Sequence, residues 1–170
     1  VLDSSVKISE YIAECKSIGI AVLPPDLNES YDHFSVSEKG IRFGLAAVKN
    51  IGRGFIQRVV QERTENGLFS DLEDFCARMY GADLNKRALE NLIKCGACDC
   101  FGLHRSQMLQ IYDTVLDSVA NSRRKNVDGQ MGLFDSFADD AEPVVPAVRV
   151  PELPELSRRE MMAMEKETTG

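Results

Sequence analysis

The chain has 170 residues, a formal net charge of −7 and an ordinary hydrophobic content of 44%, which suit one globular domain or two small ones. Its apolar runs are only a few residues long and no signal peptide is visible, which argues against a transmembrane helix and favours the cytoplasm for its five cysteines. The negative total argues against a protein coated with basic charge for nucleic acid, but the charge is uneven, with +4 over residues 41–63 and −5 over residues 128–160.

The first forty residues predict a helix followed by a small β-hairpin. Gly19 is placed to end the helix, whose apolar residues recur at helical spacing from about Ser5: Ile8, Tyr11, Ile12, Cys15 and Ile18. After the extended Pro24-Pro25 pair, residues 33–36 and 41–43 alternate weakly around a polar turn, which predicts two antiparallel strands.

The stretch 44–63 predicts two short helices joined by a tight turn, because apolar residues recur every three or four positions on both sides of residues 49–54. The turn holds Asn50, Gly52 and Gly54, the residue types that best tolerate left-handed backbone angles. Such a turn aims unused N–H groups one way at a helix N-terminus, which suits an anion. Five basic residues and one acidic residue accompany it: Arg42, Lys49, Arg53, Arg58, Arg63 and Glu62.

This stretch is similar to the helix-hairpin-helix family, whose modules hold the backbone of nucleic acid without reading its sequence. The usual turn of that family is Gly-apolar-Gly, and Asn50 replaces the first glycine here. The resemblance implies a DNA-binding turn made of six residues: Lys49, Asn50, Ile51, Gly52, Arg53 and Gly54. The alternative interpretation is an ordinary helical hairpin with a polar turn.

A second helical pair is predicted after residue 67, and it lacks the Gly-apolar-Gly turn. Ser70 and Glu73 match a capping box for its first helix, and Asn85 is the expected N-cap of the next. Their buried residues are expected to be Leu72, Phe75, Cys76, Met79, Leu89, Leu92 and Ile93. This pair is a candidate degenerate copy of the first. A longer helix is predicted from Ser106, with four residues on its buried face: Leu109, Tyr112, Leu116 and Val119.

Residues 126–156 predict a disordered linker, because acidic residues and prolines leave too little apolar surface to fold. Within it, Leu133 and Phe134 are either an isolated exposed hydrophobic pair or, with Gln130, the anchors of a linear motif that fills a partner's pocket, and the disorder on both sides favours the motif. Ser157 and Glu160 then predict a capping box for a loose last helix.

Three cysteines and a nearby histidine, Cys95, Cys98, Cys100 and His104, invite a zinc site. Small buried or incidental cysteines are the favoured interpretation, since Cys98 and Cys100 are expected to point to opposite sides. Asp26, Glu29 and Asp32 are interpreted as a solvated loop rather than a metal site. The sequence has no P-loop and no dinucleotide fingerprint, so we predict no catalytic residue, metal or cofactor in this chain.

The order of these segments resembles one region of the bacterial replicative DNA polymerase III alpha subunit, a C-family polymerase. The resemblance runs nearly end to end and rests on residues 11–20, 22–30, 41–52, 84–94, 130–134 and 157–170. It implies a mainly α fold in four parts. These are the end of the fingers domain with the β-hairpin (1–40), a tandem helix-hairpin-helix domain (41–125), a flexible, disordered linker with a clamp-binding motif (126–156), and a helix leading toward an OB-fold domain (157–170).

The resemblance also implies what these parts do. The full polymerase would extend a primer with magnesium held in a palm domain outside this chain, so the segment alone is expected to be inactive. It would hold double-stranded DNA, tether the enzyme to the sliding clamp through Gln130, Leu133 and Phe134, and contact other domains and replisome subunits, but no membrane. The competing interpretations are a structural brace with no DNA binding of its own and a zinc-binding adaptor.

Overall fold

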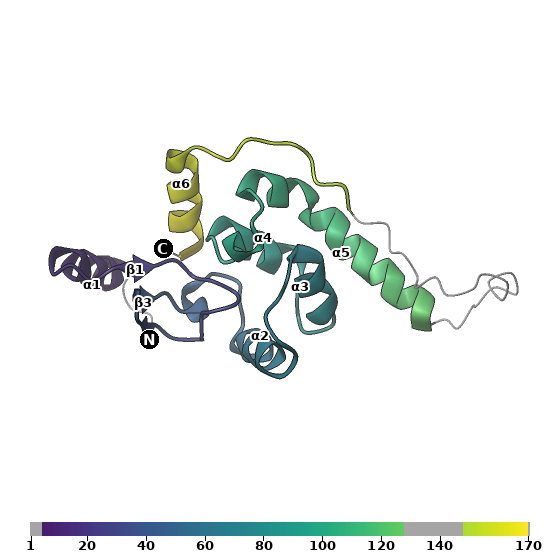
Figure 1. The fold of residues 1–170 in the computed structure, drawn as a ribbon, viewed down its shortest axis with the longest axis horizontal. Helices are drawn as coiled ribbons and strands as arrows, with labels where there is room; N and C mark the ends of the chain where they lie inside the picture. The colour runs from purple at the N-terminus through teal and green to yellow at the C-terminus, as the bar shows by residue number, and fades with distance from the viewer. Residues whose placement is uncertain (1–4, 128–147, 170) are drawn as a thin grey trace, which may run out of the picture.

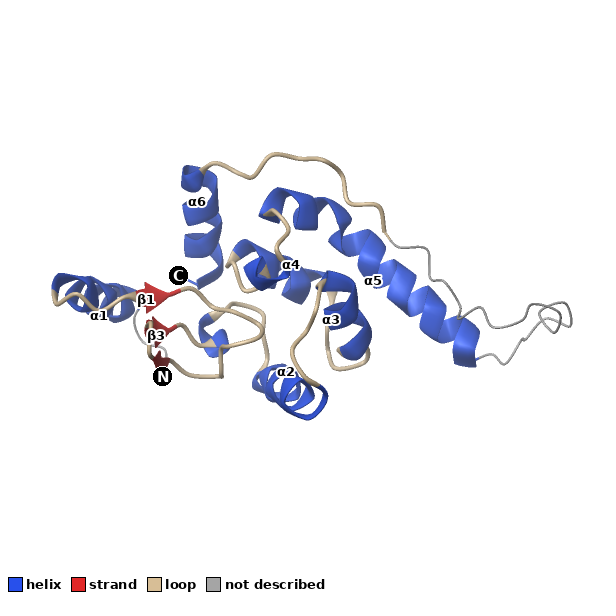
Figure 2. Ribbon diagram, viewed as in Figure 1, coloured by secondary structure: helices blue, strands red, loops and turns tan. Residues whose placement is uncertain are grey.

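The computed structural model describes residues 5–127 and 148–169, and it is mainly helical as predicted (Figure 1; Figure 2). The predicted clamp motif and residues 128–147 of the predicted linker 126–156 lie outside the described residues. The elements in chain order are α1 (Ser5–Ser17), β1 (Val22–Leu23), β2 (Ser35–Ser37), β3 (Gly40–Arg42), the short 3-10 helix η1 (Leu45–Ala47), α2 (Arg53–Asn66), α3 (Leu72–Arg78), α4 (Lys86–Lys94), the 3-10 helix η2 (Asp99–Phe101), α5 (Arg105–Val127) and α6 (Arg158–Thr169).

The N-terminal part contains the predicted helix and hairpin, and one more strand. Antiparallel β2 and β3 pair Val36 with Ile41, and β1 adds in parallel so that the strand order is β1-β3-β2. The Ile41 amide donates to the Ala21 carbonyl at 2.9 Å, and a Cβ on Gly40 would come within 2.2 Å of that oxygen. A glycine at this position therefore lets β1 approach. Tyr11, expected on the buried face of α1, is 62% exposed.

The core lies among α2, α3, α4 and α5, as the periodic apolar residues predicted. Phe75 is completely buried and meets Phe69 edge-on, with ring centroids 5.0 Å apart. Its neighbours in the core include Ile56, Val59, Leu89, Leu92, Ile93, Met108 and Val115. Burying a side chain of this size stabilises the fold by roughly 1.5–3 kcal/mol. This apolar burial holds the two helical pairs together.

Two details of the helical body differ from the sequence predictions. The N-cap of α3 is Asp71 rather than Ser70, because the Asp71 carboxylate accepts the Asp74 N–H at 2.8 Å while Asp74 accepts the Ser70 N–H at 3.0 Å. The capping pair is thus shifted by one residue from Ser70 and Glu73. Along α5, the most deeply buried residues are Met108, Ile111 and Val115, and the four that we expected inward are only partly buried.

Residues 148–156, expected as part of a flexible linker, lie extended along the start of α5 (Figure 1). The Glu155 carboxylate accepts the N–H groups of Arg105 and Ser106, at 3.0 and 3.4 Å, and so caps α5 from a distant part of the chain. The Ser106 hydroxyl donates to the Pro154 carbonyl at 2.6 Å. We call residues 148–169 the C-terminal arm, which comprises this extended stretch and α6.

The last helix begins as predicted and packs more firmly than expected. The Glu160 N–H donates to the Ser157 hydroxyl at 3.3 Å, and the Glu160 carboxylate accepts the Ser157 N–H at 2.8 Å, which completes the expected capping box. α6 packs beside α4, and Thr168 near its end is 2% exposed. It is therefore held against the body rather than loose.

Candidate nucleic-acid interface

The turn at residues 49–54, which we call the first turn, has one left-handed residue, Asn50, with φ of 62°. The residue types in the turn predicted such an angle. Gly52 is extended (φ −80°, ψ 150°) and Gly54 lies inside α2, so neither glycine is required for a left-handed angle. The helix expected before the turn is only the single 3-10 turn η1, which differs from the prediction of two short helices. Gly44 lets the chain pass close to the Asp32 backbone just before η1, because a Cβ at this position would lie 2.5 Å from the Asp32 carbonyl oxygen.

The N-terminus of α2 is open. Gly52 is the N-cap and supplies no side-chain cap, and the first helical bond runs from the Ile56 N–H to the Gly52 carbonyl at 3.1 Å. Helix geometry leaves the N–H groups of Arg53, Gly54 and Phe55, ahead of that bond, without helical acceptors. A Cβ placed on Gly52 or Gly54 would meet nothing within 4 Å. Backbone donors and open space here suit an anionic ligand.

Two of the five basic residues of this stretch, Arg42 and Arg63, are buried and make contacts within the protein. Arg42 is 9% exposed, donates to the Pro24 carbonyl at 2.9 Å and pairs with Glu29. Arg63 is 8% exposed, donates to the Leu27 carbonyl at 2.7 Å and lies over the Tyr31 ring. Burial lowers the pKa of Arg63. These two arginines therefore add no exposed charge beside the turn, because their partners lie in the loop 24–31.

The other three basic residues are exposed, and one of them is engaged. The Lys49 ammonium donates to the Glu167 carbonyl at 2.7 Å, near the C-terminus of α6. Arg53 and Arg58 lie on α2, and within residues 10–124 and 148–169 neither forms an ion pair. Lys49 keeps its positive charge, but its ammonium is held at the end of α6, whereas Arg53 and Arg58 are exposed on α2.

A second turn repeats the first in backbone but not in side chains. Asp83 takes the left-handed position of Asn50 (φ 64°), a half-buried Leu84 follows in place of Ile51, and Asn85 is the N-cap. The Asn85 side chain accepts the Ala88 N–H at 2.9 Å, as predicted, and so occupies one of the free donors. We expected a degenerate copy without the glycines from the sequence, and both turns share the order acid or amide, apolar, cap and base.

The basic residue at the start of α4 is paired. Lys86 lies 3.2 Å from Asp113 and 3.6 Å from Asp117, both on α5. The hydrogen bond with Asp113 raises the pKa of the Lys86 ammonium. An incoming phosphate would therefore compete with two carboxylates and a side-chain cap at this helix end.

The three cysteines and the histidine that invited a zinc interpretation are not arranged as a metal site. Cys98 is buried and Cys100 is exposed, and the Cys95 thiol donates to the Leu92 carbonyl at 3.3 Å. Burial raises the pKa of Cys76 and of Cys95 to about 12, which disfavours the thiolate that zinc needs. Over the part of the chain that the structure describes, no cluster of three or more His, Cys, Asp or Glu is arranged to hold a metal.

The loop 26–32 uses its acidic residues within the protein. The Asp26 carboxylate accepts the N–H groups of Asn28 and Glu29, at 2.7 and 3.2 Å. Glu29 pairs with Arg42, and the Asp32 carboxylate accepts the His33 N–H at 2.9 Å. These contacts shape the loop, as expected for Asx turns.

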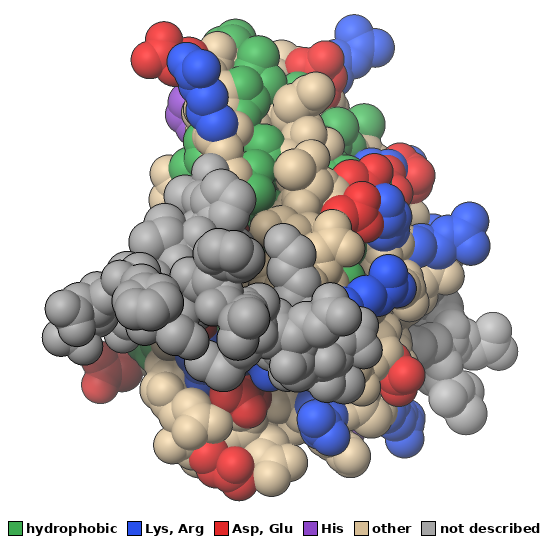
Figure 3. Space-filling model, turned by 90° about the vertical axis from the view of Figure 1, so that its right-hand side faces the viewer, with side chains coloured by type: hydrophobic (Ala, Val, Ile, Leu, Met, Phe, Trp, Pro, Cys, Tyr) green, Lys and Arg blue, Asp and Glu red, His purple; other side chains and the backbone are tan. Residues whose placement is uncertain are grey.

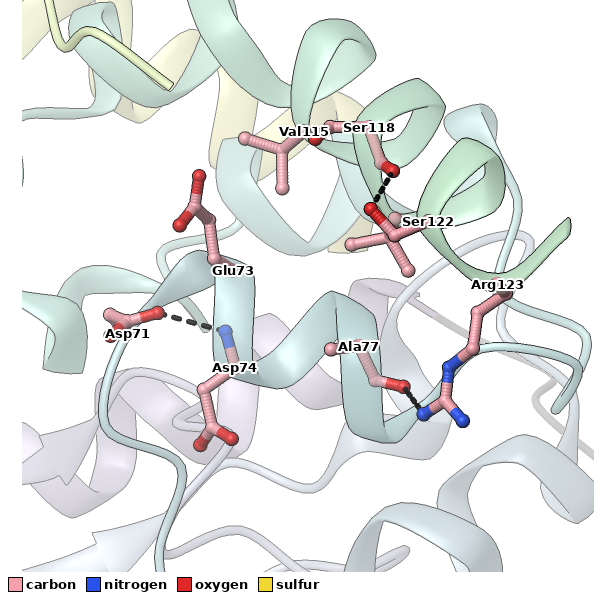
Figure 4. A pocket seen from close by; sticks show the side chains of 9 residues that line it. Asp71, Glu73, Asp74, Ala77, Val115, Ser118, Ser122 and Arg123 are labelled. Carbon is pink, nitrogen blue, oxygen red and sulfur yellow. Dashed lines mark hydrogen bonds between the residues drawn. The ribbon is translucent and has the colours of Figure 1, made fainter. Parts of the chain in front are cut away.

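A groove of about 400 Å³ lies between α3 and α5 (Figure 4). Asp71 and Asp74 at one end are engaged in the α3 cap, and Glu73 accepts the Val148 N–H at 2.9 Å. At the other end Arg123 donates to the Ala77 carbonyl at 3.1 Å. Its polar residues thus brace α3, α5 and the arm. Figure 3 shows one face of the molecule, on which basic and acidic side chains lie next to one another.

One sequence prediction stays untested by this geometry. Gln130, Leu133 and Phe134, the predicted clamp anchors, lie outside the described residues. Among residues 5–127 and 148–169, no helix is long and apolar enough to cross a membrane.

Comparison with known proteins supplies a family. A family profile described as a helix-hairpin-helix motif matches residues 19–108. Three similar proteins are each named DNA polymerase III subunit alpha: those of Thermus aquaticus (40% identity), Vibrio cholerae (37%) and Chlamydia pneumoniae (34%). The matches cover 98–99% of this chain but only 13–14% of each relative, so the chain spans about one seventh of their length.

Proposed function

Because the chain belongs to the helix-hairpin-helix family and corresponds to one segment of bacterial DNA polymerase III alpha subunits, we propose that it holds duplex DNA by its backbone without reading sequence. The observation that carries this proposal is the open N-terminus of α2 beside the turn 49–54. Phosphate contacts of this kind fix position and carry no sequence information.

In the proposed complex the N–H groups of Ile51, Gly52 and Gly54 donate to phosphate oxygens. Asn50 supplies the left-handed angle that turns the chain toward them, and Arg53 adds a charge at the first position of the helix. The two glycines matter here for the room that they leave, since the space where a Cβ would stand is open at both positions. The helix dipole favours the same anion.

The test is anisotropy of a labelled DNA duplex titrated with the chain at several salt concentrations. Binding is expected to ignore sequence and to fall steeply with salt. A variant with Gly52→Val and Arg53→Glu, shown to be folded, is expected to lose binding. Arg87→Glu on α4 is a matched control, since it makes the same charge change as Arg53→Glu on the helix with the capped end. Affinity that does not change with salt would contradict the proposal.

A specific observation favours a second candidate, a structural brace that does not bind DNA. Arg42, Lys49 and Arg63, three of the five basic residues near the turn, donate to carbonyl groups of other segments. A brace predicts DNA binding that is absent or unaffected by the Gly52→Val and Arg53→Glu changes, so the same titration separates the two candidates.

We also propose that residues 126–156 tether the polymerase to a sliding clamp. Leu133 and Phe134 would enter an apolar pocket, and Gln130 would make a polar contact at its rim, in the manner of a short linear motif. Support comes from the sequence and from family membership. Leu133→Ala with Phe134→Ala is expected to abolish binding of a bacterial sliding clamp in a pull-down or titration. Unchanged binding by the double variant would contradict the motif.

The activity of the whole protein is a proposal of the same kind. The full-length chain would be a DNA-directed DNA polymerase of the cytoplasm, with magnesium and the catalytic residues in segments beyond this one. In that setting residues 1–40 would end the fingers, residues 41–125 would hold the duplex, and residues 157–170 would lead toward the OB-fold and other replisome contacts. Primer extension by the full-length protein, with none by this segment, is the expected result.

A further inference from the structure

The C-terminal end of α6 is bonded to the first turn. The Lys49 N–H donates to the Thr168 carbonyl at 2.9 Å, and the Lys49 ammonium donates to the Glu167 carbonyl at 2.7 Å. From the other side, the Asn91 amide of α4 donates to the Lys49 carbonyl at 2.8 Å. All three polar groups of Lys49, which directly precedes the left-handed Asn50, are thus held by residues distant in the sequence.

These bonds have a clear physical basis. The last carbonyls of a helix lack helical donors and carry the negative end of its dipole, so an ammonium and an N–H are well matched to them. The end of α6 is itself fixed, because Thr168 is 2% exposed and its hydroxyl donates to the Met164 carbonyl at 2.8 Å. The α6 C-terminus is therefore an ordered support.

The arm that supplies this support is anchored at several points. Glu165 of α6 lies 2.8 Å from Arg105, which is 5% exposed and also pairs with Asp99 at 2.7 Å. Burial alone would lower the pKa of Arg105, but the hydrogen bonds and charges of the two carboxylates raise it, so the guanidinium stays charged. Earlier in the arm, Glu155 caps the N-terminus of α5, the helix that begins with Arg105.

We propose that α6, together with Asn91, positions the turn, and that Lys49 is a positioning residue rather than a phosphate ligand. A left-handed angle is unfavourable for a residue with a Cβ, so Asn50 needs its neighbouring peptide groups held in place. Bonds to both the N–H and the carbonyl of Lys49 do this. The inference rests on the proposed DNA binding, and it makes the affinity for DNA depend on the docking of the C-terminal arm.

The first experiment loosens the arm in the full chain with Glu165→Arg. This change places a cation against Arg105 and adds positive charge, so general electrostatics predicts tighter DNA binding. Positioning predicts the opposite, with affinity falling about tenfold as the turn loses its support. Glu152→Arg, on an exposed residue of the same arm, makes the same charge change as a control and is expected to leave the affinity unchanged or raise it.

The second experiment measures how the affinity for DNA depends on salt. A residue with a purely structural role should leave this dependence unchanged. Lys49→Met is expected to weaken binding about threefold while leaving the slope of log affinity against log salt unchanged, whereas Arg53→Met should reduce that slope by about one. Because Lys49 is exposed, its variant is expected to fold even if Glu165→Arg does not. A slope reduced by about one in Lys49→Met would overturn the role assigned to this residue.

Amide hydrogen exchange separates failure of this inference from failure of DNA binding. The Lys49 amide is expected to be protected in the parent and to exchange at least tenfold faster in Glu165→Arg, while the buried Leu92 amide reports that the fold is intact. If the parent binds no DNA but the Lys49 amide behaves in this way, the proposed function fails and α6 still holds the turn. Unchanged Lys49 exchange, or DNA binding by folded Glu165→Arg as tight as that of the parent, would overturn the positioning.

Discussion

The N-termini of α2 and α4 have nearly the same backbone and opposite surroundings. Each follows a left-handed residue and a half-buried apolar residue, and each starts with a base, Arg53 or Lys86. Gly52 leaves the donors of α2 uncapped, whereas the Asn85 side chain caps α4 and Asp113 neutralises Lys86. Turn geometry alone therefore does not make an anion site, because a cap can occupy a backbone donor and a nearby acid can neutralise the base from within the protein.

The largest expected effect concerns what the two copies share, their buried face. Ile56 and Leu89 occupy the same place in α2 and α4, and each is at most 1% exposed. Replacing either with alanine leaves a cavity, so each change should lower the free energy of unfolding by about 2–5 kcal/mol. Urea unfolding measures this loss. A much smaller loss at one position would show that the two copies do not support the core equally.

The next effect comes from closing the open end. Gly52→Asn gives α2 the cap residue of α4, and its side-chain oxygen should take an N–H meant for phosphate. DNA affinity is expected to fall about tenfold, while the free energy of unfolding stays within a few tenths of a kcal/mol, since asparagine and glycine are both good N-caps. Anisotropy and thermal unfolding of the same sample test both. Undiminished DNA binding would show that the open cap is not the site.

A smaller, opposite effect is expected from opening the closed end. A variant with Asn85→Gly, Asp113→Asn and Asp117→Asn frees the α4 donors and releases Lys86 from its acidic partners. DNA affinity should rise by about threefold, and the salt slope should steepen by about one if Lys86 then meets phosphate. The double variant Asp113→Asn and Asp117→Asn, with Asn85 kept, separates the effect of charge from that of the cap. Equal gains in both variants would assign the effect to charge alone.

The smallest effect extends the comparison to α5, whose N-terminus is capped by Glu155 of the arm. Burial tends to raise the pKa of this carboxyl, but the N–H groups of Leu156, Arg105 and Ser106 lower it overall. A lowered pKa in the folded state means that the carboxylate stabilises above the unfolded pKa, near 4.5, and that this stabilisation is lost as the pH falls through the folded pKa. Glu155→Gln should therefore cost about 0.5 kcal/mol at pH 7.

The pH dependence provides the control for that prediction. The difference in unfolding free energy between the parent and Glu155→Gln should shrink steadily below about pH 4.5, where the parent carboxyl becomes protonated. A difference that stays constant from pH 7 to pH 3 would show that the cost comes from packing rather than from the carboxylate cap.

Much of the helical body followed from local patterns. The end of α1 at Gly19, the cap at Asn85 and the antiparallel β2–β3 hairpin were all predicted, because each depends on residues a few positions apart. The parallel β1 strand was not predicted, since two residues carry no period and their partner lies about twenty positions away. The α3 cap was missed by one residue, where Asp71 and Asp74 compete with Ser70 and Glu73.

The features of the candidate site likewise divide into those that local patterns predicted and those that depend on tertiary contacts. Local patterns predicted a left-handed angle somewhere among Asn50, Gly52 and Gly54 and unused N–H groups at a helix start, because backbone freedom and helix ends are local properties. Which charges remain outside depends instead on tertiary contacts. Arg42 and Arg63 meet carbonyls of the loop 24–31, Lys86 meets acids of α5, and Lys49 meets the end of α6. Such pairings depend on which distant segments the core brings together, and no local pattern contains that information.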